Sequence, residues 1–305
     1  MAGTAGGELT AAVSEAGGFG MIGGTSGAGP DWLRAQIRLA RERTRHPFGV
    51  GFISSFPGLD DLVQVALEER VAAVNHSFAD PSPYVAAAHA AGVKLFAQVQ
   101  SVAQAAAAVK AGVDLVVAQG TEAGGHTGAI AGTLSFVPAV VEAVGDVPVV
   151  AAGGIADGRG LAAVLMLGAA GAWMGTRFVA SREWGGGAWE QRAVLAATAD
   201  DTVRTSVYDL VREAHFPEGI ADRVLRNPFN AAWHGREAAI PQHRAELRHQ
   251  LADAAQRGDA SVVDVSAGVG AGLVHSVHPA GEIVRRTVRE AEQVMRARCA
   301  DLLRP

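Results

Sequence analysis

Residues 93–119 read VKLFAQVQSVAQAAAAVKAGVDLVVAQ, and this stretch decides the fold. Two short apolar runs, 93–99 and 113–118, enclose an alanine-rich segment, 101–111, that starts with serine and ends before Gly112. Apolar runs without alternation are typical of strands that are buried on both faces, as in parallel sheets. The serine suits a helix N-cap and the glycine a left-handed helix end. The stretch therefore predicts a strand, a crossover helix and a parallel strand.

The same alternation of apolar runs and helical stretches continues to Ser181. This βα period predicts an α/β protein with the fold of a TIM (β/α)8 barrel. The expected strands are residues 19–22, 48–53, 71–75, 93–99, 113–118, 147–151 and 170–174. The expected helices include residues 7–16, 31–43, 60–69, 82–91, 101–111 and 157–167. Ala-Gly pairs at 16–17, 91–92, 111–112 and 170–171 are predicted to end the helices before four of the strands.

The first barrel strand is incomplete in this sequence. Only residues 1–5 precede the first expected helix, so they supply no more than the end of a strand. A barrel that lacks one strand exposes two sheet edges, which is costly. We therefore expect a truncated first strand, or a natural start that lies upstream. An open doubly wound sheet, which tolerates a missing strand, is the alternative.

The βα rhythm stops after Ser181. Helical character then returns without intervening apolar runs, at residues 183–199, 221–225 and 236–257. We predict a mainly helical insertion after the last strand, which covers the barrel mouth. The expected insertion is 182–279, and the expected barrel is 1–181 with 280–305.

Composition and charge exclude several classes of protein. The 305 residues are 49% hydrophobic and 19% charged, so the chain can bury a barrel-sized core. A net charge of -5, with the arginines of 34–45 spaced along one wet helix face, predicts no nucleic-acid partner. The longest uncharged stretch is broken by glycines, which predicts no membrane span. The single cysteine, Cys299, cannot form an intrachain disulfide, so a cytoplasmic setting is expected.

The segment QGTEAGGHTG at 119–128 directly follows an expected strand and carries one histidine, His126. Its four glycines let the backbone turn sharply and approach a ligand closely. Imidazole titrates near neutral pH, so it can serve as acid, base or hydrogen-bond donor. We predict that His126 is catalytic and that Gly124 and Gly125 border a bound ligand. A structural loop histidine is the alternative.

Two glycine turns follow the last two expected strands. They are Gly153-Gly154 and Gly175-Thr176. In βα barrels the loops after strands seven and eight commonly hold a phosphate, using bare backbone N–H groups and the start of a short helix. We therefore expect these residues to bind a phosphate. A tight strand-to-helix turn without a ligand is the alternative.

Amide side chains lie at the ends of three other expected strands: Asn75, Gln98 and Gln119. Three amides in a barrel mouth suit a neutral heterocycle with alternating donors and acceptors, such as an isoalloxazine ring. Each amide alone could instead cap a strand end in water. Their matching positions favour a ligand.

These segments together resemble the nitronate monooxygenase family, formerly the 2-nitropropane dioxygenases. The resemblance covers nearly the whole chain. The same motifs are found in flavin-dependent enoyl-acyl carrier protein reductases and do not separate the two activities. The resemblance to the family rests on residues 119–128, on AAGGI at 151–155 and MGTRF at 174–178, and on Met1-Ala2-Gly3 and AGGFG at 16–20.

The resemblance implies an FMN-dependent barrel with the phosphate on the two glycine turns. The three amides would contact the flavin ring or ribityl chain, and the backbone of Met1 and Ala2 would line it. The family's active-site histidine corresponds to His126, as base or as anion stabiliser. The implied reaction is oxidation of alkyl nitronates, or of nitroalkanes, by O2 to a carbonyl compound and nitrite. Family members carry a full apolar strand before the position of Met1, and this chain does not.

Three functions remain open: an FMN-dependent nitronate monooxygenase, an FMN- and NAD(P)H-dependent enoyl-acyl carrier protein reductase, and a degenerate, non-catalytic flavin barrel. All three bind small molecules, and the sequence leaves the oligomeric state open. Lys94 and Lys110 lie at the wrong places for Schiff-base catalysis. His275 and His278 lack a definite metal-ligand cluster, so we expect no metal site.

Overall fold

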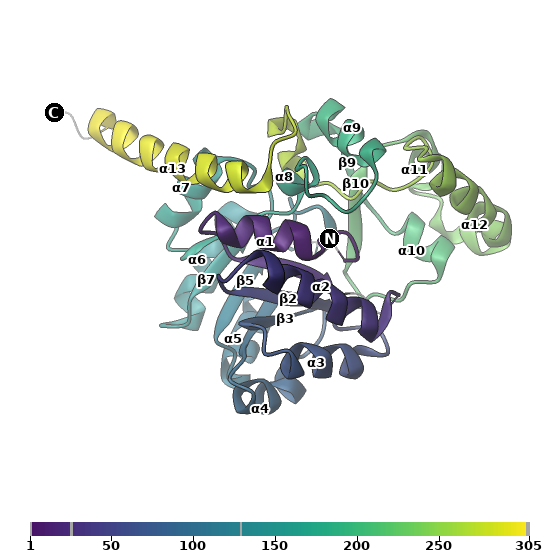
Figure 1. The fold of residues 1–305 in the computed structure, drawn as a ribbon. Coiled ribbons are helices and arrows are strands. Elements are labelled where there is room, and N and C mark those ends of the chain that lie inside the picture. Colours follow the sequence, from purple (N-terminus) through teal and green to yellow (C-terminus); the bar gives the residue numbers. More distant parts are fainter. Residues whose placement is uncertain (1, 25–26, 129, 303–305) are drawn as a thin grey trace.

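Seven parallel strands form one curled sheet in the computed structural model, which describes residues 2–24, 27–128 and 130–302 (Figure 1). The strand order is β1-β2-β3-β4-β5-β7-β8, so neighbours in the sequence are neighbours in space. This arrangement confirms the predicted α/β barrel class, as a sheet whose two ends are β1 and β8. The strands are β1 (Gly20–Gly24), β2 (Phe48–Ile53), β3 (Ala73–Ser77), β4 (Lys94–Val99), β5 (Leu115–Gln119), β7 (Val149–Ala152) and β8 (Gly171–Trp173).

Helices cover the outer face of this sheet (Figure 1). The main core lies between the two layers, where each fully buried aliphatic side chain contributes about 1.5–3 kcal/mol. The C-terminal helix α13 packs on α7 and α1. The helices are α1 (Gly7–Glu15), α2 (Gly29–Arg43), α3 (Leu59–Glu68), α4 (Ser82–Ala90), α5 (Val102–Ala111), α6 (Thr133–Val144), α7 (Gly158–Met166) and α13 (Ala280–Leu302).

Most of the predicted helix signals are confirmed. Ser101 caps α5, and Asp157 caps α7 by accepting from two backbone N–H groups. Glycines 17, 92 and 112 have positive φ after α1, α4 and α5. The prediction was wrong for Gly171, which begins β8, because α7 ends earlier and Gly168 takes the left-handed conformation.

The strand register places the three predicted amides on the inner face of the curled sheet. Asn75 lies beside Phe96, and Gln98 lies beside Ser77 and Val117. Side chains alternate along a strand, so Ser77 and Gln98 point to the same face as Asn75, and Gln119 points to the same face as Val117 and Gln98. From Asn75 to Gln98, and again from Gln98 to Gln119, the position moves two residues closer to the carboxyl ends of the strands. The amides therefore line the barrel interior in three steps rather than at one level.

The first strand does not form in the described residues. Residues 2–5 form a turn that bonds to both backbone groups of one residue of β1, since Gly3 N–H donates to Gly23 O and Gly23 N–H donates to Ala5 O, both at 2.9 Å. The expected strand end at residues 1–5 is thus wrong for 2–5, and Met1 lies outside the described residues. β1 and β8 do not pair within the described chain.

A second sheet is antiparallel, with the order β6-β10-β9. Residues 221–225, expected to be helical, form its central strand, because five residues paired on both sides satisfy more backbone groups than one helical turn. The segment with His126 supplies β6, so the insertion and the barrel share this sheet. Its strands are β6 (Gly125–Thr127), β9 (Thr202–Thr205) and β10 (Ala221–Leu225).

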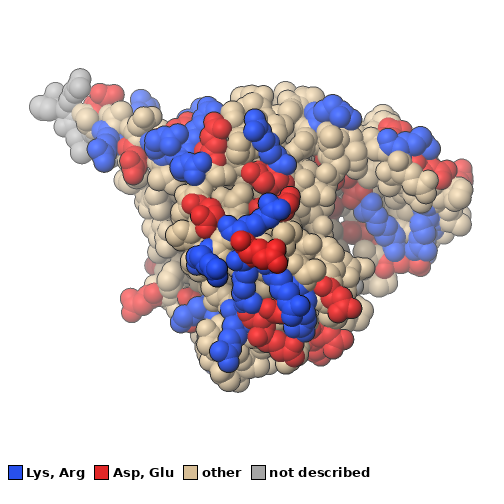
Figure 2. All heavy atoms as spheres, viewed as in Figure 1, with Lys and Arg blue, Asp and Glu red and all other residues tan. Residues whose placement is uncertain are grey.

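Three helices, α10 (Val207–Arg212), α11 (Pro228–Trp233) and α12 (Ile240–Arg257), form a separate lobe beyond this sheet, drawn green in Figure 1. The lobe has a core of its own around Tyr208, Val224 and Ile240. Figure 2 shows a hollow between the lobe and the barrel body. The helices after β8 are α8 (Thr176–Val179), α9 (Ala188–Ala196), α10 (Val207–Arg212), α11 (Pro228–Trp233) and α12 (Ile240–Arg257).

Charges of both signs are interspersed over the barrel helices (Figure 2). Three arginines of α2 pair with Glu68 and Glu69 at the end of α3, which agrees with the predicted solvent-facing side of this helix; they are Arg34, Arg38 and Arg41. No helix among the described residues has the length and apolarity needed to cross a membrane.

Candidate active site

His126 lies on β6 and points at a carboxylate of the insertion. Its Nε2 is 2.9 Å from Oδ1 and 3.0 Å from Oδ2 of Asp209, which stands on α10. The imidazole is 18% exposed and the carboxylate 12%. The expected loop ends at Gly125, where pairing with β10 begins, so the histidine is on a strand. Its Nδ1 forms no hydrogen bond with another described residue.

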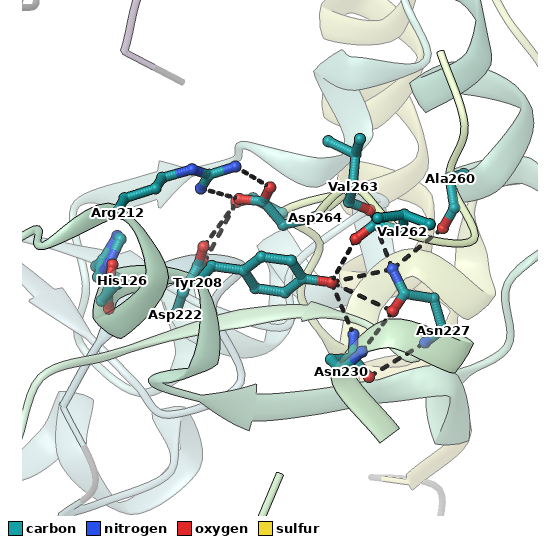
Figure 3. Close-up of polar contacts among 12 residues, drawn as sticks. His126, Tyr208, Arg212, Asp222, Asn227, Asn230, Ala260, Val262, Val263 and Asp264 are labelled. Atoms are coloured by element: carbon teal, nitrogen blue, oxygen red, sulfur yellow. Dashed lines mark hydrogen bonds and ion pairs between the residues drawn. The ribbon is translucent and has the colours of Figure 1, made fainter. Parts of the chain in front are cut away.

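Further carboxylates surround this pair. Asp222 lies directly opposite His126 in the β6–β10 ladder, and Ser266 Oγ donates to it at 3.3 Å. Burial raises the pKa of Asp222 to about 6; nearby His126 opposes the rise, and Asp264 and Asp209 add to it. Figure 3 shows Asp264 bound by Arg212 beside Asp222 and His126.

An aromatic wall, Phe56, Phe78 and Phe216, encloses the imidazole of His126. Phe216 stacks on it with ring centroids 3.5 Å apart and an interplanar angle of 12°. Phe78 meets it edge-on at 6.4 Å, and Phe56 meets Phe216 edge-on at 5.0 Å. The sequence reasoning missed this wall, although Phe78 directly follows a strand. Its φ of 67° is a left-handed conformation that bulky residues rarely adopt.

Side chains from both parts of the chain hold the backbone around His126. Gln119 Nε2 donates to His126 O at 3.0 Å, and its Oε1 accepts from Gln100 Nε2 at 3.0 Å. Arg204 donates to Thr127 O, and Arg223 Nε donates to Thr121 O at 2.9 Å. The structure therefore places Gln119 as a link between the barrel interior and the backbone of β6.

The two deeper amides have free hydrogen-bonding capacity toward the barrel interior. Asn75 Nδ2 donates to Ser77 Oγ at 3.0 Å, while its Oδ1 is buried without a partner among the described residues. The Gln98 side chain is half-buried and also makes no hydrogen bond within this part of the chain. A buried carbonyl without a partner costs about 1–3 kcal/mol, so this position fits a ligand that donates a hydrogen bond.

The first predicted glycine turn packs against the segment that leads to His126. Gly153 and Gly154 have φ of 106° and 72°, which favour glycine. A Cβ on Gly153 would lie 3.0 Å from Ala123 N, so the turn requires glycine for close approach as well. Neither N–H group donates to another described residue. The structure thus brings the turn and the histidine segment together.

The other predicted ligand contacts differ in accessibility. Gly175 precedes α8, and the N–H groups of Gly175 and Thr176 have no acceptor among the described residues, whereas Thr176 Oγ1 accepts from Gly268 N at 3.0 Å. A Cβ on Gly124 would collide with the backbone of 267–268, while Gly125 faces open space.

The remaining candidates lie apart from this cluster. Ala2 is exposed in the N-terminal turn, and Met1 is not among the described residues. His278 contacts Ser276 and Glu282 near the start of α13. Within the described part of the chain, no group of three or more His, Cys, Asp or Glu side chains is placed to hold a metal ion.

Comparison with known proteins gives full-length likenesses. The family model described as nitronate monooxygenase matches residues 1–62 and 53–290. Nitronate monooxygenase npaC of Metarhizium robertsii is 35% identical over 327 residues, covering 96% of this chain and 90% of that protein. The solved structure of FabK from Thermotoga maritima has a TM-score of 0.88 and 37% identity, covering 98% of this chain and 93% of that one. Nitroalkane oxidase from Streptomyces ansochromogenes has a TM-score of 0.84 and 30% identity, covering 97% and 95%.

Proposed function

Because the chain belongs to the nitronate monooxygenase family, we propose that it oxidises alkyl nitronates with O2 to a carbonyl compound and nitrite. Family membership implies an enzyme with a flavin cofactor, and we propose that the flavin is FMN. The observation that carries the proposal is the packing of the Gly153 turn against the segment that ends in His126. This packing supports a site in which the glycine turn binds a phosphate and the segment beside it carries the acid–base group.

The residues of the barrel interior fit a flavin. The buried Asn75 Oδ1 lacks a partner among the described residues and would accept from a ring N–H, and Gln98 would face the ring or ribityl chain. The free N–H groups of the two glycine turns would hold the phosphate. Gly125 faces open space and leaves room at the ring edge. When bound, FMN would supply the electron transfer from the nitronate to O2.

Other proposed cofactor contacts have other roles within the chain as well. Gln119 would approach the flavin while it holds the backbone of His126. Gly124 would bring its backbone near the ring because it packs tightly on Gly268. Ala2 and Met1 would line the flavin through the N-terminal turn. These assignments follow the family resemblance.

His126 is the proposed catalytic residue. A nitronate carries its negative charge on the nitro oxygens, and an imidazole N–H beside them offsets this charge. The same imidazole can instead remove the acidic α-proton of a nitroalkane as a general base. The aromatic wall of Phe56, Phe78 and Phe216 covers part of the imidazole and would offer an apolar surface to the alkyl chain.

A second candidate function is reduction of an enoyl-acyl carrier protein by NAD(P)H on the same FMN barrel. The likeness to FabK, at 37% identity over 98% of the chain, favours keeping it. The same amides and glycine turns would serve both reactions, so the identity of the electron donor distinguishes them. The electron donor would be NAD(P)H in this case and the nitronate in the first.

An absorption spectrum of the purified protein, followed by anaerobic mixing with a nitronate and with NADH, tests the proposal. We expect a flavin spectrum that bleaches with the nitronate, and nitrite release with O2 uptake in air without NADH. Bleaching by NADH and its consumption with an enoyl thioester would instead establish the second function. A colourless protein that FMN cannot reconstitute would contradict both and leave a degenerate barrel.

The setting of the protein is proposed from composition. The single cysteine, which cannot form an intrachain disulfide, supports a cytoplasmic location. The net charge of -5, with charges of both signs interspersed, supports a small-molecule rather than a nucleic-acid partner.

A further inference from the structure

We propose that Asp209 is a positioning residue that fixes the tautomer of His126. By accepting the hydrogen of Nε2, it leaves the lone pair on Nδ1, which then acts as the base toward a neutral substrate. The reaction part of this inference rests on the proposed function. The tautomer is a property of the chain alone and is tested separately.

The hydrogen-bond geometry supports this assignment. Nε2 lies 2.9 and 3.0 Å from the two oxygens of Asp209. An ionised carboxylate only accepts hydrogen bonds, so Nε2 must carry the hydrogen. In a neutral imidazole the other nitrogen, Nδ1, then holds the lone pair. Nδ1 makes no hydrogen bond to any residue in the described ranges, so it is available to a ligand.

The ring is held in one orientation by contacts from several elements. The backbone oxygen of His126 accepts a hydrogen bond from Gln119, and β6, which carries His126, pairs with β10. Phe216 stacks against one face of the ring. With Asp209 bound to Nε2, the direction of Nδ1 is fixed, as a general base requires.

Carboxylates from two other elements lie around this ring. Asp209 of α10 and Asp222 of β10 face His126 directly. Behind them lies Asp264, which is bound by Arg212 of α10. When the imidazole takes a proton, its positive charge therefore meets two nearby carboxylates in a partly buried site. Opposite charges at such short distances attract one another, so these carboxylates can pair with the imidazolium that the proposed step forms.

The proposed step is a balanced proton transfer. The α C–H bond of a neutral nitroalkane breaks, and its electron pair moves into the nitro group to give the nitronate. A new N–H bond forms at Nδ1 of His126, and the resulting imidazolium keeps its Nε2–H on Asp209. The new N–H then donates to the nitro oxygens, so one side chain is base first and anion stabiliser second.

The ¹⁵N NMR signals of the imidazole test the tautomer independently of turnover. The signals of His126 are identified by their loss in a His126→Gln variant of the flavin-loaded protein. We expect the proton on Nε2 in the wild type and a shift toward Nδ1 in Asp209→Asn, whose amide can donate to Nε2. A wild-type imidazole with its proton on Nδ1 would overturn the proposal.

Kinetics with two forms of one substrate test the role in the reaction. Asp209→Asn should lower kcat for a neutral nitroalkane about 100-fold, the scale of general base catalysis, but lower it much less for the preformed nitronate. Asp209→Glu should recover part of the loss. The control is Asp253→Asn in the exposed His249–Asp253 pair of α12, which should change neither rate.

Two other outcomes would refute the positioning role of Asp209 or the proposed function. An equal loss on both substrate forms, with an unchanged tautomer and a lower melting temperature, would show that Asp209 only holds the insertion in place. Lack of turnover with both forms in the wild type would refute the proposed function, while the NMR result would still decide the tautomer.

Discussion

Two regions of this molecule each place a histidine against an aromatic ring, with different results. His76 of β3 stacks on Tyr84 of α4 with ring centroids 4.5 Å apart, and its Nδ1 bonds to Ser54 Oγ at 2.8 Å. His126 stacks on Phe216 and bonds to the carboxylate of Asp209. His76 has a hydroxyl partner between sheet and helices, whereas His126 has a carboxylate partner at the barrel mouth.

This difference shows that burial alone does not make a histidine useful for acid–base chemistry. Burial lowers the pKa of His76 to about 4, so it stays neutral at physiological pH. Its Nε2 is buried without a partner among the described residues. His126 instead has the carboxylates of Asp209 and Asp222 beside it, and these can pair with an imidazolium that forms during a reaction. The two sites therefore predict opposite consequences of substitution.

Replacing His126 should have the largest effect. His126→Ala should keep the yellow flavin, because the proposed cofactor contacts lie on other residues, but kcat should fall about 10²–10⁴-fold. The matched variant His76→Ala should retain most activity and lose stability. Steady-state nitrite release and the visible spectrum measure both variants. Full activity of His126→Ala would refute its catalytic assignment.

The second largest effect should be the dependence of stability on pH that His76 causes. Its folded pKa of about 4 lies below the ordinary 6.5, so the folded state binds fewer protons than the unfolded state. The free energy of unfolding is therefore highest above pH 6.5, and it decreases by about 3 kcal/mol as the pH falls to about 4. In His76→Phe this loss should be absent. Urea unfolding across this pH range measures it, and parallel curves for both proteins would contradict the prediction.

Asp222 should change the pH dependence of stability in the opposite direction to His76, by a similar or smaller free energy. Its folded pKa of about 6 lies above the ordinary 3.8, so the folded state binds more protons. Its contribution is present below pH 3.8 and is lost as the pH rises through 6, by at most about 3 kcal/mol. Asp222→Asn, which resembles the protonated form, should be more stable than the wild type at pH 8. A less stable variant at that pH would show that the charged carboxylate is needed.

The smallest expected effect concerns the ring over His126. Phe216→Ala removes the stacked pair, which is worth about 0.5–1.5 kcal/mol beyond area burial. We expect a small fall in melting temperature and a higher KM for longer alkyl nitronates, with kcat less affected. Phe216→Leu should recover part of the KM, since it restores apolar surface. An unchanged KM in both variants would place the alkyl chain elsewhere.

Local patterns in the sequence were enough for most of the barrel. The period of apolar runs and helices predicted seven strands in nearly correct places. Each strand of the sheet packs against the strands and helices that come next to it in the chain, so local sequence patterns are enough to locate it. Ser101 and Asp157 were predictable as caps, since capping depends on residues within one turn. Residues 221–225 were not predictable as a strand, because their partners β6 and β9 are distant in the chain.

The candidate site divides in the same way. His126 and the glycines at 153–154 stand in short recognisable segments, so the sequence by itself determined that an imidazole and a possible phosphate turn follow barrel strands. Only the tertiary structure decided that Asp209, 83 residues away from His126, holds its ring, and that Phe216 covers it. The physical reason is that periodicity and capping act within a few residues. A hydrogen bond between β6 and α10 instead depends on how two elements that are far apart in the chain come together in the fold.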